Sequence, residues 1–384
     1  MISMAHRVRD FGTTIFFEMT ELANRHQAVN LGQGFPDFPG PDFIKTAAVD
    51  AIQHDLNQYA PGTGQPRLRR AIAQKMEDFY GLSVDPDSEL TVTTGATGAI
   101  FATILGLVDP GDEVILFEPY YDSYLPATLI AGGIPRFYTL HAPDWSIDEA
   151  ELSALFSDKT KLILINTPHN PTGKVFSRAE LDCIARLCQQ HDVIAVTDEV
   201  YEHIVFDDVE HWCLATWPGM ADRTVTMSSA GKTFGMTGWK VGWAIGRPEL
   251  VQSIVRVHQF MVYCGATPLQ EAVATALQTS PDYYAKLAAM YQSNRDFLGD
   301  VLADVGLNPL MPKGTYFMMA DISHLDFPDD VAFCRYLTTE IGVTAIPPSA
   351  FYHNPADGAN IARFAFCKTR AVLEEAARRL TKLK

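Results

Sequence analysis

Short apolar runs alternate with helical patterns between about Glu89 and Gly246. Several of the runs are nearly continuous in β-branched and other apolar residues, which is typical of strands that are buried on both faces of a sheet. Seven runs predict strands, at Thr91–Thr94, Glu113–Phe117, Arg136–Leu140, Leu162–Asn166, Val193–Thr197, Thr224–Met227 and Val241–Ile245. This order predicts an α/β fold with a mostly parallel, seven-stranded central sheet.

Helical patterns fill the intervals between these strands. Ala99–Val108 is an apolar candidate, and Ser177–His191 is an amphipathic one. The second begins with Ser177 and has Glu180 three residues later, which is the spacing of a capping box. Strands that alternate with helices in this way are typical of an open α/β sheet.

The alternation stops after Ile245. A long helical region, Glu249–Val305, is interrupted near Gly265–Pro268. A smaller α+β segment then follows, with strands at Phe317–Asp321, Val343–Ile346 and Ile361–Phe366 and amphipathic helices at Asp329–Ile341 and Leu373–Leu383. We therefore predict two domains: residues 1–44 as an arm and part of the small domain, 45–281 as the large domain, and 282–384 as the rest of the small domain.

Composition narrows the range of partners. The 384 residues are enough for two domains, and 30 basic against 46 acidic side chains leave a net charge of −16. Such a surface repels phosphate backbones and anionic membranes, which argues against nucleic-acid binding. A few local basic groups would still suffice to bind a small anionic ligand, and no metal site is expected.

Nothing in the sequence indicates export or a membrane segment. The first ten residues carry His6, Arg7 and Arg9 and lack the apolar core of a signal peptide. The longest apolar stretch, Ala99–Val108, is about half as long as a bilayer span requires. The six cysteines show no paired CxxC spacing. We therefore expect a reduced, cytoplasmic protein.

Polar and glycine residues gather directly after four of the predicted strands. In open α/β sheets ligands bind beyond the carboxyl ends of the strands, so these segments are expected to meet at one crevice. They are Thr94-Gly-Ala-Thr-Gly98, Asn166-Thr-Pro-His-Asn-Pro-Thr-Gly173, Asp198-Glu-Val-Tyr201 and Ser228-Ser-Ala-Gly-Lys232.

Each segment also has a purely structural interpretation. Gly95–Gly98 fits either a tight strand-to-helix turn or a phosphate cradle at a helix N-terminus. Asn170-Pro171 fits a turn, Asp198 fits a helix cap, and Lys232 fits a solvated loop lysine. In the chemical interpretation, Asp198 and Tyr201 point the same way, a protonated pyridine ring neutralises the buried carboxylate, and Lys232 attacks a carbonyl group. A nicotinamide fold is a weaker rival because the GxGxxG spacing is missing.

The combination of these motifs resembles the class I aminotransferases of fold type I. It consists of Asn-Pro-x-Gly at 170–173, Asp-x-x-Tyr at 198–201, and Ser-x-x-Lys at 229–232 followed by Gly-Trp-Lys-Val-Gly-Trp at 238–243. Within that family it most resembles the kynurenine, glutamine and methionine aminotransferases. Further matching segments run nearly end to end, at Asn30–Phe38, Asn57–Tyr59, Val257–Gln259, Gly314–Phe317 and Ile361–Phe364.

The resemblance implies a pyridoxal 5'-phosphate enzyme with three catalytic residues. Lys232 would hold the cofactor as a Schiff base and move the proton of the substrate α-carbon. Asp198 would pair with the pyridinium nitrogen, so that the ring stays an electron sink. Tyr201 and Asn170 would bind the phenolic oxygen of the cofactor, and the ring of Tyr121 would stack on the pyridine.

The resemblance also implies a phosphate site that two subunits share. Ala96 and Thr97 would donate N–H groups, Ser229 its hydroxyl and Lys240 a positive charge. Tyr59 would reach the phosphate of the neighbouring subunit, which implies a functional homodimer. Lys240 stands where many class I relatives carry arginine, and this supports the kynurenine-type branch over the aspartate aminotransferases.

The implied substrates are an amino acid and a 2-oxo acid. Arg363 matches the anchor of the substrate α-carboxylate and Gly34 a loop that approaches it, although Arg363 alone would fit a surface position on an edge strand better. Asn170 also faces the substrate, and Phe16 and Tyr263 match the side-chain pocket. Thr97 and Cys264 stand where kynurenine-type relatives often carry Tyr and His, which favours a slimmer apolar substrate over kynurenine.

These matches predict transfer of the amino group of a methionine-like or aromatic L-amino acid to a 2-oxo acid by a ping-pong mechanism. The alternative within the same chemistry is a cysteine-S-conjugate β-lyase. The same fold also occurs in binding proteins that are fused to DNA-binding regulators, but the net charge of −16 argues against that role.

Overall fold

The computed structural model describes residues 4–9 and 11–383, so Met1–Ser3, Asp10 and Lys384, including part of the N-terminal stretch considered above, lie outside the described residues. The centre of the molecule is a seven-stranded sheet with the order β2-β8-β7-β6-β5-β3-β4. Its strands are β2 (Leu90–Thr94), β3 (Glu113–Glu118), β4 (Ile134–Thr139), β5 (Thr160–Asn166), β6 (Ile194–Asp198), β7 (Thr224–Ser229) and β8 (Val241–Ile245). Strand β8 is antiparallel to both of its neighbours, and the other pairs are parallel. The predicted mostly parallel seven-stranded sheet is confirmed.

Alternate residues of the strands face two different sets of helices. Val114 and Leu116 of β3 pack toward one face, whereas Ile115 and Phe117 pack toward the other. The first face is covered by α4 (Gly95–Leu107), α5 (Tyr124–Ala131) and α9 (Pro248–Met261). The opposite face carries α6 (Glu149–Ser153) and α7 (Arg178–Gln190), and toward its β2 edge α2 (Asp42–Gln53), α3 (Pro66–Tyr80) and α10 (Thr267–Leu277). Both faces are therefore buried, as the apolar strand pattern predicted.

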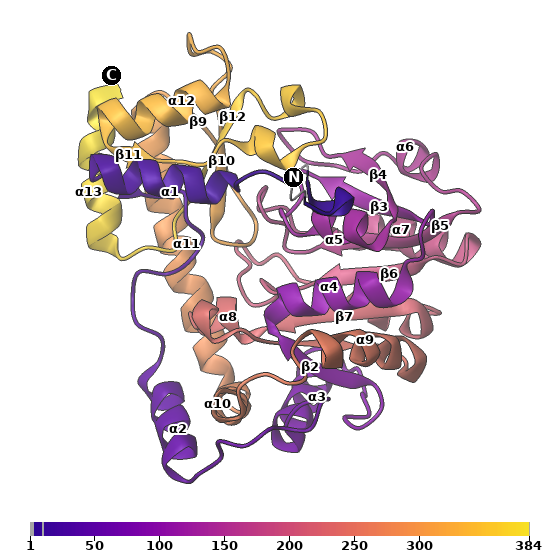
Figure 1. Ribbon diagram of the computed structural model, residues 1–384. Helices are drawn as coiled ribbons and strands as arrows, with labels where there is room; N and C mark the ends of the chain where they lie inside the picture. The colour runs from indigo at the N-terminus through magenta and orange to yellow at the C-terminus, as the bar shows by residue number, and fades with distance from the viewer. Residues whose placement is uncertain (1–3, 10, 384) are drawn as a thin grey trace.

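The two ends of the chain form a second, smaller layer beside the strand ends (Figure 1). A two-stranded parallel sheet pairs Val29 with Val343, and a three-stranded antiparallel sheet has the order β12-β10-β9. The elements of this layer are α1 (Ile15–His26), β1 (Val29–Asn30), α11 (Pro281–Asp304), β9 (Asn308–Leu310), β10 (Phe317–Asp321), α12 (Asp330–Tyr336), β11 (Val343–Thr344), β12 (Ile361–Ala365) and α13 (Arg370–Leu380). Helix α11 connects the layers, because Tyr284 packs with the β2–β8 core and Leu287 with the smaller layer. The boundaries at 44/45 and 281/282 remain a prediction.

Several predicted boundaries differ from the structure for local reasons. The helix expected at Ala99 begins at Gly95, immediately after β2. The predicted helical region 249–305 has a second break, at residues 278–280, because Ser280 caps a new helix that has Pro281 in its first turn. The helix expected over 329–341 is α-helical to Tyr336 and continues as a π-helical turn. The capping box of Ser177 and Glu180 is present as predicted.

Short elements complete the described chain. They are η1 (His6–Val8), η2 (Leu214–Thr216), η3 (Ala221–Arg223), α8 (Ala230–Thr233), η4 (Thr237–Trp239), η5 (Leu337–Ile341), η6 (Pro348–Phe351), η7 (Pro355–Asp357) and η8 (Thr381–Leu383). Among the described helices, none is both long enough and apolar enough to cross a bilayer.

Candidate active site

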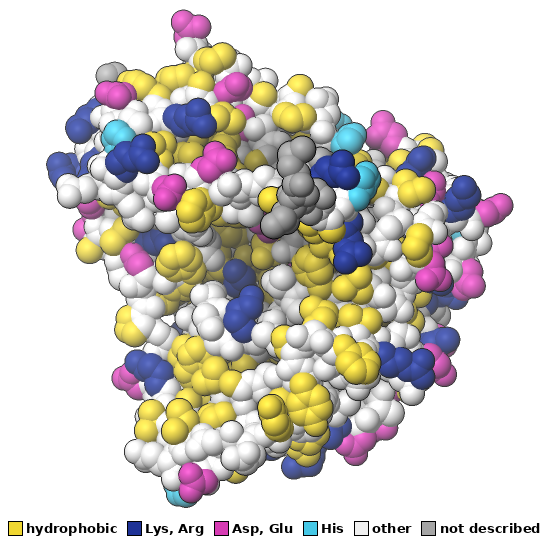
Figure 2. Space-filling view, viewed as in Figure 1, with side chains coloured by type: hydrophobic (Ala, Val, Ile, Leu, Met, Phe, Trp, Pro, Cys, Tyr) yellow, Lys and Arg dark blue, Asp and Glu magenta, His cyan; other side chains and the backbone are white. Residues whose placement is uncertain are grey.

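A pocket lies at the carboxyl ends of β2, β5, β6 and β7, where the small layer meets the large sheet. The surface is hollowed at this level, and basic and hydrophobic side chains surround the hollow (Figure 2). All four segments that the sequence analysis singled out contribute to its wall. They provide Gly95, Ala96, Thr97, Asn166, Asn170, Asp198, Val200, Tyr201, Ser229, Gly231 and Lys232, and Tyr121, Tyr124, Thr237, Lys240 and Val241 complete it.

One end of the pocket is built around the first turn of α4. The amide groups of Ala96 and Thr97 belong to this turn and have no intrahelical partner, and the helix dipole places partial positive charge there. Strand β8 packs directly against the turn, since a Cβ atom on Gly242 would lie 2.5 Å from the carbonyl carbon of Gly95. Ser229 and Lys240 line the same end. Unpaired N–H groups, a hydroxyl and an ammonium group form a site suited to a phosphate.

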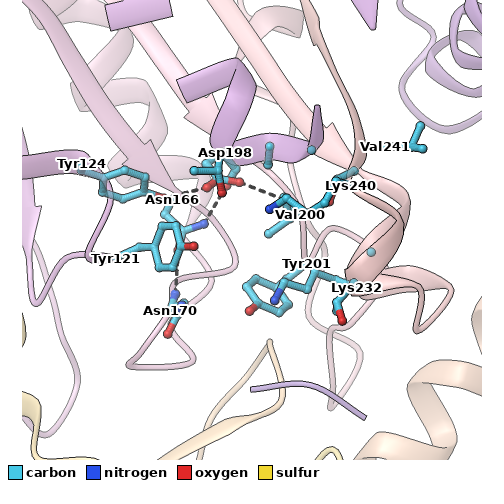
Figure 3. A pocket seen from close by; sticks show the side chains of 16 residues that line it. Tyr121, Tyr124, Asn166, Asn170, Asp198, Val200, Tyr201, Lys232, Lys240 and Val241 are labelled. Atoms are coloured by element: carbon cyan, nitrogen blue, oxygen red, sulfur yellow. Dashed lines mark hydrogen bonds between the residues drawn. The ribbon is translucent and has the colours of Figure 1, made fainter. Parts of the chain in front are cut away.

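Asp198 lies at the opposite end, where β6 ends, and is 4% exposed. Its Oδ2 accepts a hydrogen bond of 2.8 Å from the hydroxyl of Tyr124, and the amide of Val200 lies 3.4 Å from Oδ1 (Figure 3). No cation among the described residues lies within ion-pair distance of the carboxylate. Burial, only partly offset by the Tyr124 hydroxyl, raises the pKa of Asp198 to about 6. A cation placed beside this carboxylate would stabilise its charged form, and the described side chains do not supply such a cation.

Asn166 and Asn170 connect this carboxylate to the middle of the pocket. The side-chain amide of Asn166 donates to the backbone oxygen of Asp198 (2.8 Å), and its Oδ1 accepts from the amide of Asn170 (2.7 Å). Tyr201 lies across from them on the turn after β6 (Figure 3). Its side chain is 1% exposed, and its hydroxyl has no hydrogen-bond partner in the part of the chain that the structure describes. A buried unpaired hydroxyl is costly, so an atom that entered the pocket and bonded to it would remove this cost.

Lys232 extends from the short helix α8 into the space beside Tyr201. Its Nζ lies 5.5 Å from the ring centre of Tyr201 and 5.6 Å from that of Tyr316. Burial lowers the pKa of Lys232 to about 8, although Cys367 and Asp198 act in the opposite direction. A considerable fraction of the amine is therefore neutral near pH 8, and a neutral amine is a nucleophile.

Arg363 of β12 faces an adjoining cavity and is 1% exposed. Its Nη1 donates to Oδ1 of Asn170 (3.2 Å), and its Nη2 donates to the carbonyl oxygen of Gly32 (2.8 Å). Its Nε has no hydrogen-bond partner within residues 4–9 and 11–383. The guanidinium carbon lies 4.2 Å from the ring centre of Phe317. Burial lowers the pKa of Arg363 to about 10, so the group stays charged at neutral pH. A guanidinium group that has no carboxylate partner among the described residues is chemically suited to bind a carboxylate.

The loop around Gly34 closes this second cavity. A Cβ atom on Gly34 would lie 2.4 Å from Cζ of Phe317, so the loop needs a glycine to come so close to β10. The hydroxyl of Tyr316 donates to the carbonyl oxygen of Gly34 (2.6 Å) and holds the loop in place. The cavity is lined by Phe16, Gln33, Gly34, Tyr121, Asp122, Asn170, Tyr201, Lys232, Phe317 and Arg363.

Two of the expected site residues lie away from both cavities. Tyr59 is 83% exposed and Tyr263 is 48% exposed, and their rings contact each other edge to face at 5.3 Å. The sequence analysis also missed residues that the structure brings to the site. Asp122 lines the second cavity, and Tyr124 and Asn166 hold Asp198. Asn166 could have been found from its place at the end of a predicted strand, whereas Tyr124 carried no local signal.

Comparisons with known proteins agree with this geometry. A family model described as "Aminotransferase class I and II" matches residues 26–380. The chain belongs to the class I and II aminotransferases. Its fold-type-I architecture and its relatives confirm the predicted family.

Three relatives show how close the match is. The aminotransferase is 43% identical to the kynurenine–oxoglutarate transaminase of Dictyostelium discoideum, over 97% of this chain and 95% of the relative. It is 43% identical to the methionine aminotransferase of Escherichia coli, over 98% of this chain and 97% of the relative. The solved structure of N-succinyldiaminopimelate aminotransferase from Mycobacterium tuberculosis is 44% identical and superimposes with a TM-score of 0.97 over the full length of both chains.

Proposed function

We propose that this aminotransferase binds pyridoxal 5'-phosphate in the pocket between α4 and Asp198 and uses it to transfer amino groups. The observation that carries the proposal is the juxtaposition of complementary unpaired groups in one pocket. Among the described residues, Asp198 has no cation as an ion-pair partner and the hydroxyl of Tyr201 has no hydrogen-bond partner, and the amine of Lys232 has a lowered pKa. A phosphorylated pyridine aldehyde would provide a ring nitrogen, a phenolic oxygen and a carbonyl carbon for these three groups.

The remaining wall of the pocket also fits this cofactor. Amides of Ala96 and Thr97, the hydroxyl of Ser229 and the ammonium group of Lys240 would hold the phosphate. The ring of Tyr121 would cover one face of the pyridine. When bound, the cofactor supplies an electron sink for the negative charge that develops at the substrate α-carbon.

Each side chain around the cofactor would then have a separate role. Asp198 would keep a positive charge on the ring nitrogen, and Tyr201 and Asn170 would bind the phenolic oxygen. Arg363 would orient the donor through its α-carboxylate, so that the α-hydrogen faces the ε-amine of Lys232. Lys232 would accept that proton and later return it. We propose a ping-pong order, in which the product of the donor leaves before the acceptor binds.

We further propose that the donor is a methionine-like or aromatic amino acid. Phe16 and Phe317 provide apolar wall beside Arg363, and burying such a side chain is worth about 1.5–3 kcal/mol. The cations that line the two cavities are Lys232, Lys240 and Arg363, all of which have a proposed partner. Asp122 adds a negative charge to the second cavity. A distal carboxylate, as in aspartate or an N-succinyl donor, would therefore be disfavoured.

We propose a homodimer in which Tyr59 completes the site of the partner subunit. An exposed apolar patch supports the proposal, because a large apolar surface indicates an interface. Phe260 and Tyr59 are 88% and 83% exposed, and Leu56, Met261, Val262 and Tyr263 are each exposed by 43–48%. The patch is centred on the contact between Tyr59 and Tyr263, and Phe260–Val262 directly precede Tyr263 in the chain.

The cofactor assignment is tested by reduction of the loaded enzyme with borohydride. Lys232→Ala should abolish the covalent link between chain and cofactor and stop turnover, whereas Lys240→Ala should weaken cofactor binding but keep the link. Mass spectrometry of the reduced protein measures both results. A Lys232→Ala variant with near wild-type turnover would contradict the cofactor assignment.

The substrate assignment is tested by a steady-state panel of amino donors. Methionine, followed by phenylalanine and tyrosine, should have kcat/KM values well above that of aspartate. If aspartate or an N-succinylated diamino acid is the best donor, the substrate proposal is wrong while the cofactor proposal stands. The rate at which pyruvate is released from an S-substituted cysteine measures β-lyase activity, the alternative function, in the same enzyme samples.

A further inference from the structure

The turn that follows β6 has one side that faces the pocket, called the front here, and one side that faces away from it, called the rear. Asp198, Val200 and Tyr201 point to the front, into the pocket (Figure 3). Glu199 and Glu202 lie on the rear, with exposures of 0% and 6%. Two buried carboxylates directly behind the proposed cofactor site have no role in the chemistry described above. Their contacts show which segments of the chain they connect.

Glu202 is the centre of a buried polar cluster. Its Oε2 accepts hydrogen bonds from Nζ of Lys75 (2.6 Å) and from the hydroxyl of Tyr80 (2.7 Å), both on α3. Its Oε1 accepts a hydrogen bond of 2.7 Å from the hydroxyl of Ser228 on β7. Burial acts to raise the pKa of Glu202, but the charge of Lys75 and the hydrogen bonds from Lys75 and Tyr80 outweigh it and bring the pKa to about 2. Glu202 is therefore a permanent anion with a saturated set of donors.

Ser228 connects this anion to the other half of the pocket. It directly precedes Ser229, and Lys232 follows four residues later. The ladder between β6 and β7 ends at the pair Asp198–Met227, and a last backbone bond joins the amide of Glu199 to Met227. Beyond that point the hydroxyl of Ser228 connects the end of β7 to the turn after β6. It lies 2.7 Å from Oε1 of Glu202 and 3.4 Å from the carbonyl oxygen of Glu199. The shorter contact is the stronger one because its acceptor is charged.

We propose that Glu202 is a positioning residue that acts through the Ser228 hydroxyl to set the spacing between the two halves of the cofactor site. One half is the turn with Asp198 and Tyr201, and the other is the strand end with Ser229 and Lys232. The inference rests on the proposed function, since both halves would contact one rigid ring. A rigid ligand tolerates little error in the distance between its contacts, so a loosened link weakens binding at both ends.

Glu202 accepts hydrogen bonds from two neutral hydroxyl groups, those of Ser228 and Tyr80, and removing each of them gives a matched pair of variants. Ser228→Ala removes the donor on the cofactor side, and Tyr80→Phe removes the donor on α3, which lines neither cavity. Both variants leave the ion pair with Lys75 in place. The measurements are the dissociation constant of pyridoxal 5'-phosphate from the apoenzyme and the melting temperature of the apoenzyme. Turnover of the loaded enzyme is a separate, third readout.

Ser228→Ala should weaken cofactor binding roughly tenfold, as expected for the loss of a hydrogen bond to a charged group, while Tyr80→Phe should change it less than about twofold. If both variants lose the same cofactor affinity, or neither loses any, Glu202 is only a structural anchor and the inference is overturned. Absence of cofactor binding in the wild-type apoenzyme would instead overturn the proposed function itself.

A second pair keeps the test decisive if Ser228→Ala does not fold. Ser228→Thr and Ser228→Val have nearly the same shape and differ in the hydroxyl group. The Thr variant should bind the cofactor more tightly than the Val variant by roughly the same tenfold. Equal affinities in this pair would also contradict the inference.

Discussion

The buried carboxylate of Asp198 destabilises the protein as long as no cation faces it. Its pKa is about 6 in the folded chain against an ordinary value of 3.8, so the folded state binds the proton more tightly than the unfolded chain does. The contribution of Asp198 to the free energy of unfolding therefore falls as the pH rises from about 4 to about 6 and stays lower above that range. A difference of about two pKa units corresponds to on the order of 3 kcal/mol.

Asp198→Asn should consequently stabilise the cofactor-free protein while it damages activity. The amide cannot ionise, yet its oxygen can still accept the hydrogen bond from Tyr124. We expect a gain in unfolding free energy on the order of 2–3 kcal/mol at pH 7.5, and little gain near pH 4. Turnover of the loaded enzyme should fall at least ~10²-fold, because a buried electrostatic partner is lost. Denaturant titrations of the apoenzyme at both pH values measure the first effect; an identical gain at both would contradict the linkage.

Asp122 bears on substrate choice. It lines the cavity that contains Arg363, and burial raises the pKa of its carboxyl group while Arg363 acts to lower it. Asp122→Asn should raise kcat/KM for aspartate relative to methionine roughly tenfold, which corresponds to about 1.4 kcal/mol of relieved repulsion. Asp158→Asn, at an exposed position away from both cavities, should leave the ratio unchanged. An unchanged ratio in Asp122→Asn would remove this residue from the specificity argument.

Some residues of the site could be predicted from the sequence and others could not. Asp198, Tyr201 and Lys232 could be predicted because they directly follow strands that end at one edge of the sheet. Tyr124 could not, since its partner Asp198 is 74 residues away and the contact exists only in the folded chain. The rear contacts of Glu202 are hidden for the same reason, as Lys75 is 127 residues away.

Among the elements, the contact between β8 and the first turn of α4 shapes the proposed phosphate site. A Cβ atom on Gly242 would lie 2.7 Å from the amide nitrogen of Ala96, and neither backbone has a flexible side chain to move away. Gly242→Ala should therefore displace the turn, cost about 1–3 kcal/mol of stability, and weaken pyridoxal-phosphate binding at least tenfold.

Gly238→Ala is the matched control for this prediction. It lies four residues earlier in the same segment, and a Cβ atom there would meet nothing within 4 Å. Calorimetry and a cofactor titration of both variants distinguish a displaced turn from a general effect of removing glycine. Equal behaviour of the two variants would show that the close approach is unimportant.

Helices and strands were predicted well where their ends depend on neighbouring residues, and less well where they depend on residues far away along the chain. Strands such as Phe317–Asp321 were predicted to the residue, because burial on both faces leaves a local apolar pattern. The capping box at Ser177 is local as well. By contrast, the strand expected at Val343–Ile346 is reduced to Val343–Thr344, because its partner β1 is only two residues long. Its length was decided by a segment more than 300 residues away.

At the scale of the whole molecule, the proposed dimer can be tested by complementation. Tyr59→Ala and Lys232→Ala should each impair activity when they form homodimers. In a mixed dimer, the subunit with Lys232 would receive Tyr59 from its partner and regain one intact site. Random pairing would then recover about a quarter of the wild-type activity. No recovery on mixing would mean that Tyr59 does not serve the partner's site.

The origin of the residues that line the two cavities has a consequence for the synthesis of the chain. The residues by which one subunit lines its own proposed cofactor pocket lie between Gly95 and Val241, whereas the adjoining cavity needs Phe16 and Gly34 from one end and Phe317 and Arg363 from the other. A ribosome that adds about 5–20 residues per second needs on the order of ten seconds to proceed from Val241 to Arg363. During that interval the nascent chain already holds every residue with which it lines the proposed cofactor pocket but lacks Arg363, the proposed anchor of the donor. The residues proposed to recognise the substrate are therefore complete only after those that line the proposed cofactor pocket.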